Sequence, residues 1–221
     1  MSVPLNEFKT TTKPIPTQQE SIPISGLSYH QEVIAEDFEN ELVKWIEEKG
    51  QWNRSLPRLT QHYGLKEYSY NKSVKQTKDL KDAAPIPEIF LKLIEELRGK
   101  KVLEEKEEVD QCIVNRYVLG EGISPHTDHQ TFFAEPILSV SLNSSCVMEF
   151  DLSAHNNIIK DVRNVMIPVL LEQRSVVVLR GEARLNWRHA IKPKKIDHYP
   201  SLKYHKARAL RYSITFRKLR L

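Results

Sequence analysis

Near its C-terminal end the chain reads Arg211-Tyr212-Ser213-Ile214-Thr215-Phe216-Arg217, in which polar and apolar residues alternate. A period of two is typical of a β-strand, and it places both arginines on one face with the serine and the threonine. If the apolar face packs against helices, the two guanidinium groups point into the interior, where leaving them without partners would be very costly. A dicarboxylate would satisfy them, because guanidinium binds carboxylate through paired, charge-assisted hydrogen bonds. The alternative is an amphipathic edge strand whose arginines lie in water.

The residues before this stretch contain further short segments rich in Val, Ile, Leu, Tyr and Phe, separated by turn-prone residues such as Gly120, Gly122 and Gly181. We expect strands at residues 112–119, 137–142, 147–152, 165–171, 176–179 and 210–220. Several short strands at this spacing predict a β-sandwich or jelly roll rather than alternating βαβ units.

The first half of the chain follows a helical period instead. Apolar residues recur at helical spacing in residues 38–46, before Gly50, and in residues 87–97, where Pro87 suits a first turn. A short strand is expected at residues 27–33, and the polar residues 51–82 predict a long loop or irregular ribbon. The expected fold class is therefore α+β, with N-terminal helices packed on one sheet of a jelly-roll (double-stranded β-helix) core at about residues 111–220.

The length of 221 residues favours a single domain, which we expect at residues 27–221. Residues 1–26 carry four prolines among polar residues and few large apolar groups, so we expect a mobile N-terminal arm. The net charge is 33 − 29 = +4, which permits nucleic-acid binding without requiring it.

The sequence also indicates the compartment. No apolar run is long enough for a transmembrane helix, and the first residues lack the apolar core of a signal peptide. The two cysteines, Cys112 and Cys146, cannot form a disulfide framework or a Cys-x-x-Cys zinc site. We expect an intracellular protein, cytoplasmic or nuclear, without membrane association, and we expect a monomer.

The most informative short motif is Ser124-Pro125-His126-Thr127-Asp128. His126 and Asp128 lie on the same face of an extended segment, so both can reach one cation, whereas His129 would point to the opposite face. A third ligand from elsewhere would complete a two-histidine, one-carboxylate set, which leaves coordination positions of Fe(II) open. His189 is a candidate, although a histidine at a sheet edge would fit the same pattern, and surface His-x-Asp pairs are common.

Taken together, four motifs occur in order: Asn115-Arg116-Tyr117; His126-Thr127-Asp128; Gly181-Glu182-Ala183-Arg184 followed by His189-Ala190-Ile191; and Arg211-x-Ser213-x-Thr215-x-Arg217. On these motifs the chain resembles the AlkB family of Fe(II)- and 2-oxoglutarate-dependent dioxygenases over roughly residues 55–220. The terminal motif has Ser213 where many members of that family carry asparagine.

The resemblance implies a role for each matching residue. The implied iron ligands are His126, Asp128 and His189. The implied 2-oxoglutarate-binding residues are Asn115, Tyr117, Arg211, Ser213 and Arg217, with Arg211 at the distal carboxylate and Arg217 near the end at the metal. Arg184 resembles a residue that steadies the ligand carboxylate.

The resemblance also implies a nucleic-acid partner, as a single strand or a flipped base. Residues 51–82 resemble the family's nucleotide-recognition lid, from which Arg58, Tyr63 and Tyr70 would contact substrate. Gln130 stands where some repair members place an acidic residue against the base. The implied reaction uses Fe(II), 2-oxoglutarate and O2 to demethylate nucleobases in DNA or RNA, releasing succinate, CO2 and formaldehyde.

Two alternatives remain open at this point. The same oxygenase chemistry could hydroxylate a tRNA base, a protein or a small molecule, and the polar residues 51–82 would then be only a solvated loop. A non-catalytic binding module or a zinc hydrolase would accept the same His/Asp/His ligands. The two in-phase arginines disfavour the second alternative, since a hydrolase has no need of them.

Overall fold

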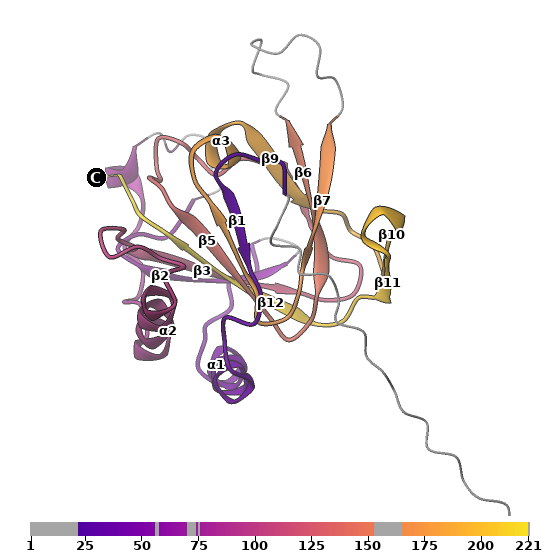
Figure 1. Ribbon diagram of the computed structural model, residues 1–221. Helices are drawn as coiled ribbons and strands as arrows, with labels where there is room; N and C mark the ends of the chain where they lie inside the picture. Colours follow the sequence, from indigo (N-terminus) through magenta and orange to yellow (C-terminus); the bar gives the residue numbers. More distant parts are fainter. Residues whose placement is uncertain (1–21, 56–57, 70–73, 75, 153–164, 221) are drawn as a thin grey trace, which may run out of the picture.

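A computed structural model describes residues 22–55, 58–69, 74, 76–152 and 165–220. Within these residues two antiparallel sheets face each other, as Figure 1 shows. The major sheet contains, in spatial order, β1 (Leu27–His30), β8 (Val176–Leu179), β5 (Ile137–Leu142), β12 (Arg211–Arg217), β3 (Gln111–Tyr117) and β2 (Leu59–Gly64). The minor sheet contains β4 (Ile123–His126), β9 (Trp187–Ile191), β6 (Cys146–Leu152) and β7 (Met166–Leu171). The expected jelly-roll core is confirmed.

Two helices cover the outer face of the major sheet, α1 (Glu36–Glu48) and α2 (Glu88–Gly99) (Figure 1). Their apolar faces join one core cluster with the outward side chains of the sheet, for example Leu42 and Phe90 with Ile214. Pro87 lies directly before α2 with an extended backbone, which suits a residue without a free N–H. The expected N-terminal helical layer is therefore present on one sheet.

Strand β12 lies at the centre of the major sheet, between β5 and β3. Its three apolar side chains belong to the helix-side cluster: Tyr212, Ile214 and Phe216. Its four polar side chains line the cavity between the sheets: Arg211, Ser213, Thr215 and Arg217. The alternation in the sequence thus becomes a division between an apolar face and a chemical face, and the edge-strand alternative is wrong.

The remaining elements are short. A 3-10 turn, η2 (Thr77–Asp79), precedes α2, and helix α3 (Gly181–Leu185) precedes β9. Strands β10 (Ile196–Tyr199) and β11 (Tyr204–Ala207) form a hairpin through the turn η3 (Pro200–Leu202). This hairpin was not predicted from the sequence, because its lysines and histidines lack the apolar alternation of a typical strand.

Residues 51–82 are not one continuous loop, because β2 pairs along its whole length with β3. The prediction failed because the segment Leu59-Thr-Gln-His-Tyr-Gly is rich in polar residues, which do not indicate a strand. Its backbone hydrogen bonds are made with β3, a strand that lies far away in the sequence. Of the two tyrosines expected to contact substrate, Tyr63 lies in the described part and is 7% exposed. Tyr70 lies outside the described residues.

The expected arm at residues 1–26 lies mostly outside the described residues, which begin at Ile22. Ile24 is only 3% exposed and packs in the core between the sheets, while the carbonyl of Ser25 accepts a hydrogen bond from the Ala183 amide. The packed structure therefore begins before residue 27. In the described part of the chain, no helix has the length and apolar character to span a bilayer.

Phe90 tests the packing of the helical layer. It is fully buried and makes edge contacts with Trp45 and Tyr63, at centroid distances of 5.1 and 5.7 Å. Replacing it with alanine should lower the free energy of unfolding by about 3–5 kcal/mol in urea denaturation, since the cavity cannot collapse fully. The control Leu91→Ala changes a neighbouring side chain that is 46% exposed, and its effect should stay within about 0.5 kcal/mol. Equal effects would contradict the packing.

Candidate active site

A cavity of about 330 Å³ lies between the two sheets. Its wall combines apolar side chains such as Met148, Val177 and Ile191 with a concentration of polar groups. The candidate metal ligands and cofactor-binding residues from the sequence all line it: Asn115, Tyr117, His126, Asp128, His189, Arg211, Ser213 and Arg217. A cavity that is mostly apolar with a few convergent polar groups is typical of a ligand site.

Strand pairing brings the two histidines together. His126 at the end of β4 is the register partner of His189 on β9, and their ring centroids are 4.3 Å apart. Asp128 follows two residues later, with its Oδ2 3.8 Å from Nε2 of His189. Side chains that are 61 residues apart in sequence (189 − 128) therefore meet at one place.

The protonation states of these groups suit a divalent cation. Burial, followed by the neighbouring His126, lowers the pKa of His189 to about 3, so its imidazole is neutral. Burial alone would raise the pKa of Asp128, but attraction to Arg217 and the nearby histidines outweighs it and lowers the pKa to about 2. The site thus holds a carboxylate and neutral imidazole, the forms that bind metals.

A hydrogen bond also fixes the orientation of His126. Its Nδ1 lies 2.8 Å from the carbonyl of Ser124, so this nitrogen carries the proton and Nε2 keeps its lone pair. Among the described residues, no three such groups already surround a common ion position. One carboxylate oxygen of Asp128 instead pairs with Nη2 of Arg217 at 2.9 Å. The donor set fits an Fe(II) ligand set in chemistry and proximity.

Arg211 is the most unusual charge in the cavity. Its side chain is 2% exposed, and Nη2 donates to the hydroxyl of Ser141 at 2.7 Å. Its Nε and Nη1 are buried and have no hydrogen-bond partner in the described structure. The ring of Tyr117 lies 5.5 Å from the guanidinium. A buried cation with two unused donors fits a carboxylate ligand.

Arg184 hydrogen-bonds to the backbone around Asp128, and its charge also helps to lower the pKa of the Asp128 carboxyl group. Its guanidinium is 2% exposed and donates to the carbonyls of Asp128, His129 and Phe133 at 2.8, 3.2 and 3.2 Å. These bonds hold residues 128–133, a segment outside the named strands in which Phe133 bridges to Leu219. Arg184 therefore positions Asp128 through the main chain.

Of the residues expected to contact substrate, some line the cavity and others do not. Arg58 lines the cavity, and its Nε donates to Oδ1 of Asn115 at 3.0 Å. Tyr63 does not: it is 7% exposed, packs among the helices and donates to Gln61, so its assignment to the substrate is wrong. On β2 the side chains alternate, and Tyr63 shares the helix-facing side with Gln61.

Gln130 lies outside the cavity wall. Its side-chain amide donates to the carbonyl of Leu185 in α3 at 2.8 Å, which turns it toward the protein backbone. This geometry therefore does not support a direct contact between Gln130 and a base in the cavity.

Two cavity residues were missed by the sequence analysis, Tyr68 and His129. The ring of Tyr68 lies 5.8 Å from the guanidinium of Arg217, and His129 stacks on Phe132 at a centroid distance of 3.9 Å. His129 was expected on the opposite face because the segment was treated as extended. Strand β4 ends at His126, so the alternation no longer applies at His129.

The comparisons with known proteins agree with this site. A family model described as the 2OG-Fe(II) oxygenase superfamily matches residues 28–217. The chain belongs to this superfamily. It is 32% identical over 221 residues to mouse tRNA (carboxymethyluridine(34)-5-O)-methyltransferase ALKBH8, covering 91% of this chain and 31% of that protein. It is 34% identical over 110 residues to Escherichia coli alpha-ketoglutarate-dependent dioxygenase AlkB, covering 49% and 45% of the two chains.

These relatives place this oxygenase in the AlkB family, and the expected dioxygenase class is confirmed. The chain spans about a third of the length of the mouse ALKBH8 protein. Protein L905 of Acanthamoeba polyphaga mimivirus matches almost end to end, with 31% identity over 89% of this chain and 86% of that protein. The solved structure of OsALKBH1 shares the fold, with a TM-score of 0.60 and 18% identity over 87% of this chain and 98% of that chain.

Arg184 gives a test of how the site is supported. Arg184→Ala should lower the free energy of unfolding by at least about 2 kcal/mol, because three carbonyls lose a buried donor. Chemical denaturation measures this. Arg188→Ala is the control: Arg188 pairs with Asp151 at 2.6 Å but is 41% exposed, so we expect a loss of at most about 1 kcal/mol. If Arg184→Ala lost no more stability than Arg188→Ala, the positioning role of Arg184 would be refuted.

Proposed function

We propose that this chain is an Fe(II)- and 2-oxoglutarate-dependent dioxygenase that oxidatively removes methyl groups from nucleobases in DNA or RNA. One observation carries the proposal: the buried guanidinium of Arg211, with two unused donors, shares a cavity with the side chains of His126, Asp128 and His189. The names of relatives support the substrate class. A further relative, from Arabidopsis thaliana, is an alkylated DNA repair protein ALKBH8 homolog, 29% identical over 94% of this chain and covering 62% of that protein.

In this proposal His126, Asp128 and His189 hold the iron. The family description implies Fe(II), and the donor set of neutral imidazoles and an ionised carboxylate fits it. When bound, the metal supplies the oxidising power for attack on a C–H bond, with O2 as oxidant and 2-oxoglutarate as reductant. The remaining tasks belong to the side chains of the cavity.

The cavity residues bind and orient 2-oxoglutarate. Arg211 pairs through Nε and Nη1 with the distal carboxylate, whose charge then compensates the buried guanidinium. Ser213, Asn115 and Tyr117 line the same wall and supply further polar contacts. Arg217 lies beside Asp128 and therefore reaches the end of the co-substrate near the metal.

The substrate base enters from the side of Arg58, Tyr68 and His129, which also line the cavity. Aromatic rings and a guanidinium plane are surfaces on which an unstacked base can lie. The apolar wall at Met148 and Ile191 excludes water from the reacting atoms.

The overall reaction balances without a further reagent. One oxygen atom of O2 enters succinate as 2-oxoglutarate loses CO2, and the other becomes a hydroxyl on the methyl carbon. An N-hydroxymethyl group then breaks its C–N bond, the nitrogen takes the hydroxyl proton, and formaldehyde leaves. The base is restored.

A second candidate is hydroxylation of a tRNA base, for which the similarity to ALKBH8 is the specific observation. A carbon without a nitrogen leaving group keeps its hydroxyl, so this reaction releases no formaldehyde. Mass analysis of the product separates the two: demethylation removes one methylene from the oligonucleotide, whereas hydroxylation adds one oxygen.

The reaction is tested by succinate release. Single-stranded DNA or RNA carrying N-methylated adenine or cytosine should stimulate succinate and formaldehyde release well above the level with unmodified oligonucleotide of the same sequence. His126→Ala and Asp128→Ala should reduce this turnover to background, because each removes a ligand of the iron. Their folding is checked by denaturation, and Mn(II) binding by equilibrium dialysis should weaken in parallel. Full turnover in either variant would refute the metal assignment.

Arg211 is tested by co-substrate affinity. Arg211→Ala should raise the apparent dissociation constant for 2-oxoglutarate about 10- to 100-fold, because two charge-assisted hydrogen bonds are lost. The measurement is succinate release as 2-oxoglutarate is varied, with calorimetry on the Mn(II)-loaded protein. Arg116→Ala, on the neighbouring strand β3, removes an arginine that lies 3.9 Å from Glu47 outside the cavity, and it should leave the affinity unchanged.

The expected location and assembly belong to the proposal as well. Cys112 and Cys146 are both free and buried, which suits a reducing intracellular compartment, cytoplasmic or nuclear. A monomer remains our expectation for the oligomeric state.

A further inference from the structure

One short segment of the chain has a clear local excess of positive charge. Residues 192–206 contain five lysines and a single acidic residue, Asp197, so their net charge is 5 − 1 = +4. The whole chain also carries 33 − 29 = +4, and the remaining residues therefore hold 28 basic and 28 acidic side chains. The segment is thus locally basic, as are residues 49–78 (7 − 1 = +6) and residues 207–221 (5 − 0 = +5).

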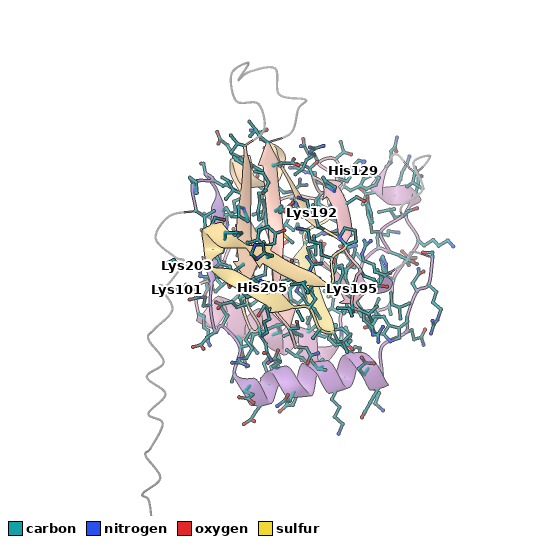
Figure 2. The ribbon with its side chains drawn as sticks, turned by 90° about the vertical axis from the view of Figure 1, so that its right-hand side faces the viewer. Lys101, His129, Lys192, Lys195, Lys203 and His205 are labelled. Atoms are coloured by element: carbon teal, nitrogen blue, oxygen red, sulfur yellow. The ribbon has the colours of Figure 1, made fainter. Side chains whose placement is uncertain are left out.

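This segment is the β10–β11 hairpin with the residues that lead into it, and we call it the basic hairpin. Figure 2 shows it crossing the front of the molecule, with Lys195 and Lys203 toward its two ends and His205 between them. Its exposed basic side chains are Lys192, Lys195, His198, Lys203, His205 and Lys206. The charge therefore spreads along one outward surface.

The two acidic groups next to the hairpin are buried, and one of them pairs with Lys192 at 2.8 Å. Asp197 is fully buried, accepts two bonds from Arg208 at 2.7 and 2.9 Å, and accepts the Val147 amide at 3.2 Å. Glu149, 6% exposed, accepts the hydroxyl of Tyr199 at 2.6 Å. These carboxylates therefore compensate Arg208 and Lys192, whereas no carboxylate of the described residues forms an ion pair with Lys195, Lys203 or Lys206.

The same contacts hold the hairpin firmly. Besides the Arg208 pair, Tyr199 packs with Val147 and Leu170 of the minor sheet in a small apolar cluster. The lysines therefore project from a fixed ribbon, and ordering that ribbon costs nothing further when a ligand binds.

The basic hairpin begins next to the cavity. His189 and Ile191 on β9 both line the cavity wall, and Lys192 follows directly. Three residues of extended chain span about 10 Å, so the first lysine of the hairpin lies within that distance of His189 along the strand. Gly122 keeps this junction close, since a Cβ there would meet the Ile191 carbonyl at 2.1 Å.

We propose that the basic hairpin binds the sugar-phosphate backbone of the single-stranded nucleic acid whose base occupies the cavity. This inference rests on the proposed function and adds a second contact region to it. A row of exposed lysines recognises a polyanion through its phosphates and without regard to base sequence. A second copy of this chain would bring like charges together. A membrane surface would call for a wide apolar face, and of the described large apolar residues only Ile196 is exposed on the hairpin.

The test compares two triple variants with equal loss of charge. Lys195→Gln/Lys203→Gln/Lys206→Gln removes three hairpin lysines. Lys44→Gln/Lys101→Gln/Lys106→Gln removes three exposed lysines elsewhere, and Lys101 matches Lys203 because both have positive φ, 57° and 49°. Binding is followed by fluorescence anisotropy with fluorescein-labelled RNA and DNA of the same sequence, about 20 nucleotides long, over a range of salt concentrations.

We expect the hairpin variant to bind the labelled oligonucleotides at least about 10-fold more weakly at low salt. The slope of log K against log salt should fall by about 2, because each lost phosphate contact contributes about 0.7 on a single strand. The control variant should bind as the wild type does. Turnover of a methylated trinucleotide, too short to span both regions, should be unchanged in the hairpin variant.

The outcomes separate this inference from the proposed function. Equal binding by both variants and the wild type overturns the hairpin assignment, even if methylated oligonucleotides are turned over. Hairpin-dependent binding without any turnover supports the hairpin as a nucleic-acid surface and counts against the demethylase reaction. Binding to vesicles containing phosphatidylserine that depends on the hairpin, with no binding to oligonucleotides, overturns the inference in favour of a membrane surface.

Discussion

Arg211 is a cation buried between two sheets with two of its three nitrogens unbonded, and this constraint organises the cavity. Burying such a charge costs several kcal/mol unless an anion reaches it. Arg217 meets the same requirement with Asp128, so the three groups together carry +1. A divalent cation and a dianion would bind without changing that sum, whereas either one alone would change it by two charges. Electrostatics therefore couples the binding of a metal to the binding of a dicarboxylate in this cavity.

The sheet topology encloses this buried charge and places the metal ligands opposite it. Strand β12 lies between β5 and β3, so its polar face is enclosed on both sides and its apolar face is covered by α1 and α2. The pairing of β4 with β9 brings His126 to His189 from the opposite sheet. The metal ligands and the arginines thus come from different layers and face each other across one cavity. This placement of metal ligands and arginines on opposite sheets agrees with membership in the AlkB family.

Much of this arrangement could be predicted from the sequence because strand alternation is a local property. The alternation of residues 211–217 correctly separated the cavity face from the core face, and the His-x-Asp spacing correctly placed two side chains together. Predictions failed where long-range pairing decides the structure. Strand β2 was not predicted because it carries polar residues, and its register with β3 turns the side chain of Tyr63 into the core. The predicted direction of His129 was also wrong, because β4 ends at His126, three residues earlier, and His129 lines the cavity. Strands β10 and β11 were not predicted, because their lysines and histidines lack the apolar alternation of a typical strand.

The most direct measurement is a crystal structure of the protein with Mn(II), in place of Fe(II), and 2-oxoglutarate under anaerobic conditions. We expect anomalous density for the metal between Nε2 of His126, the Asp128 carboxylate and Nε2 of His189. We also expect that the distal carboxylate of 2-oxoglutarate accepts hydrogen bonds from Nε and Nη1 of Arg211. A metal bound elsewhere, or a co-substrate that leaves the Arg211 guanidinium without a carboxylate partner, would contradict the account.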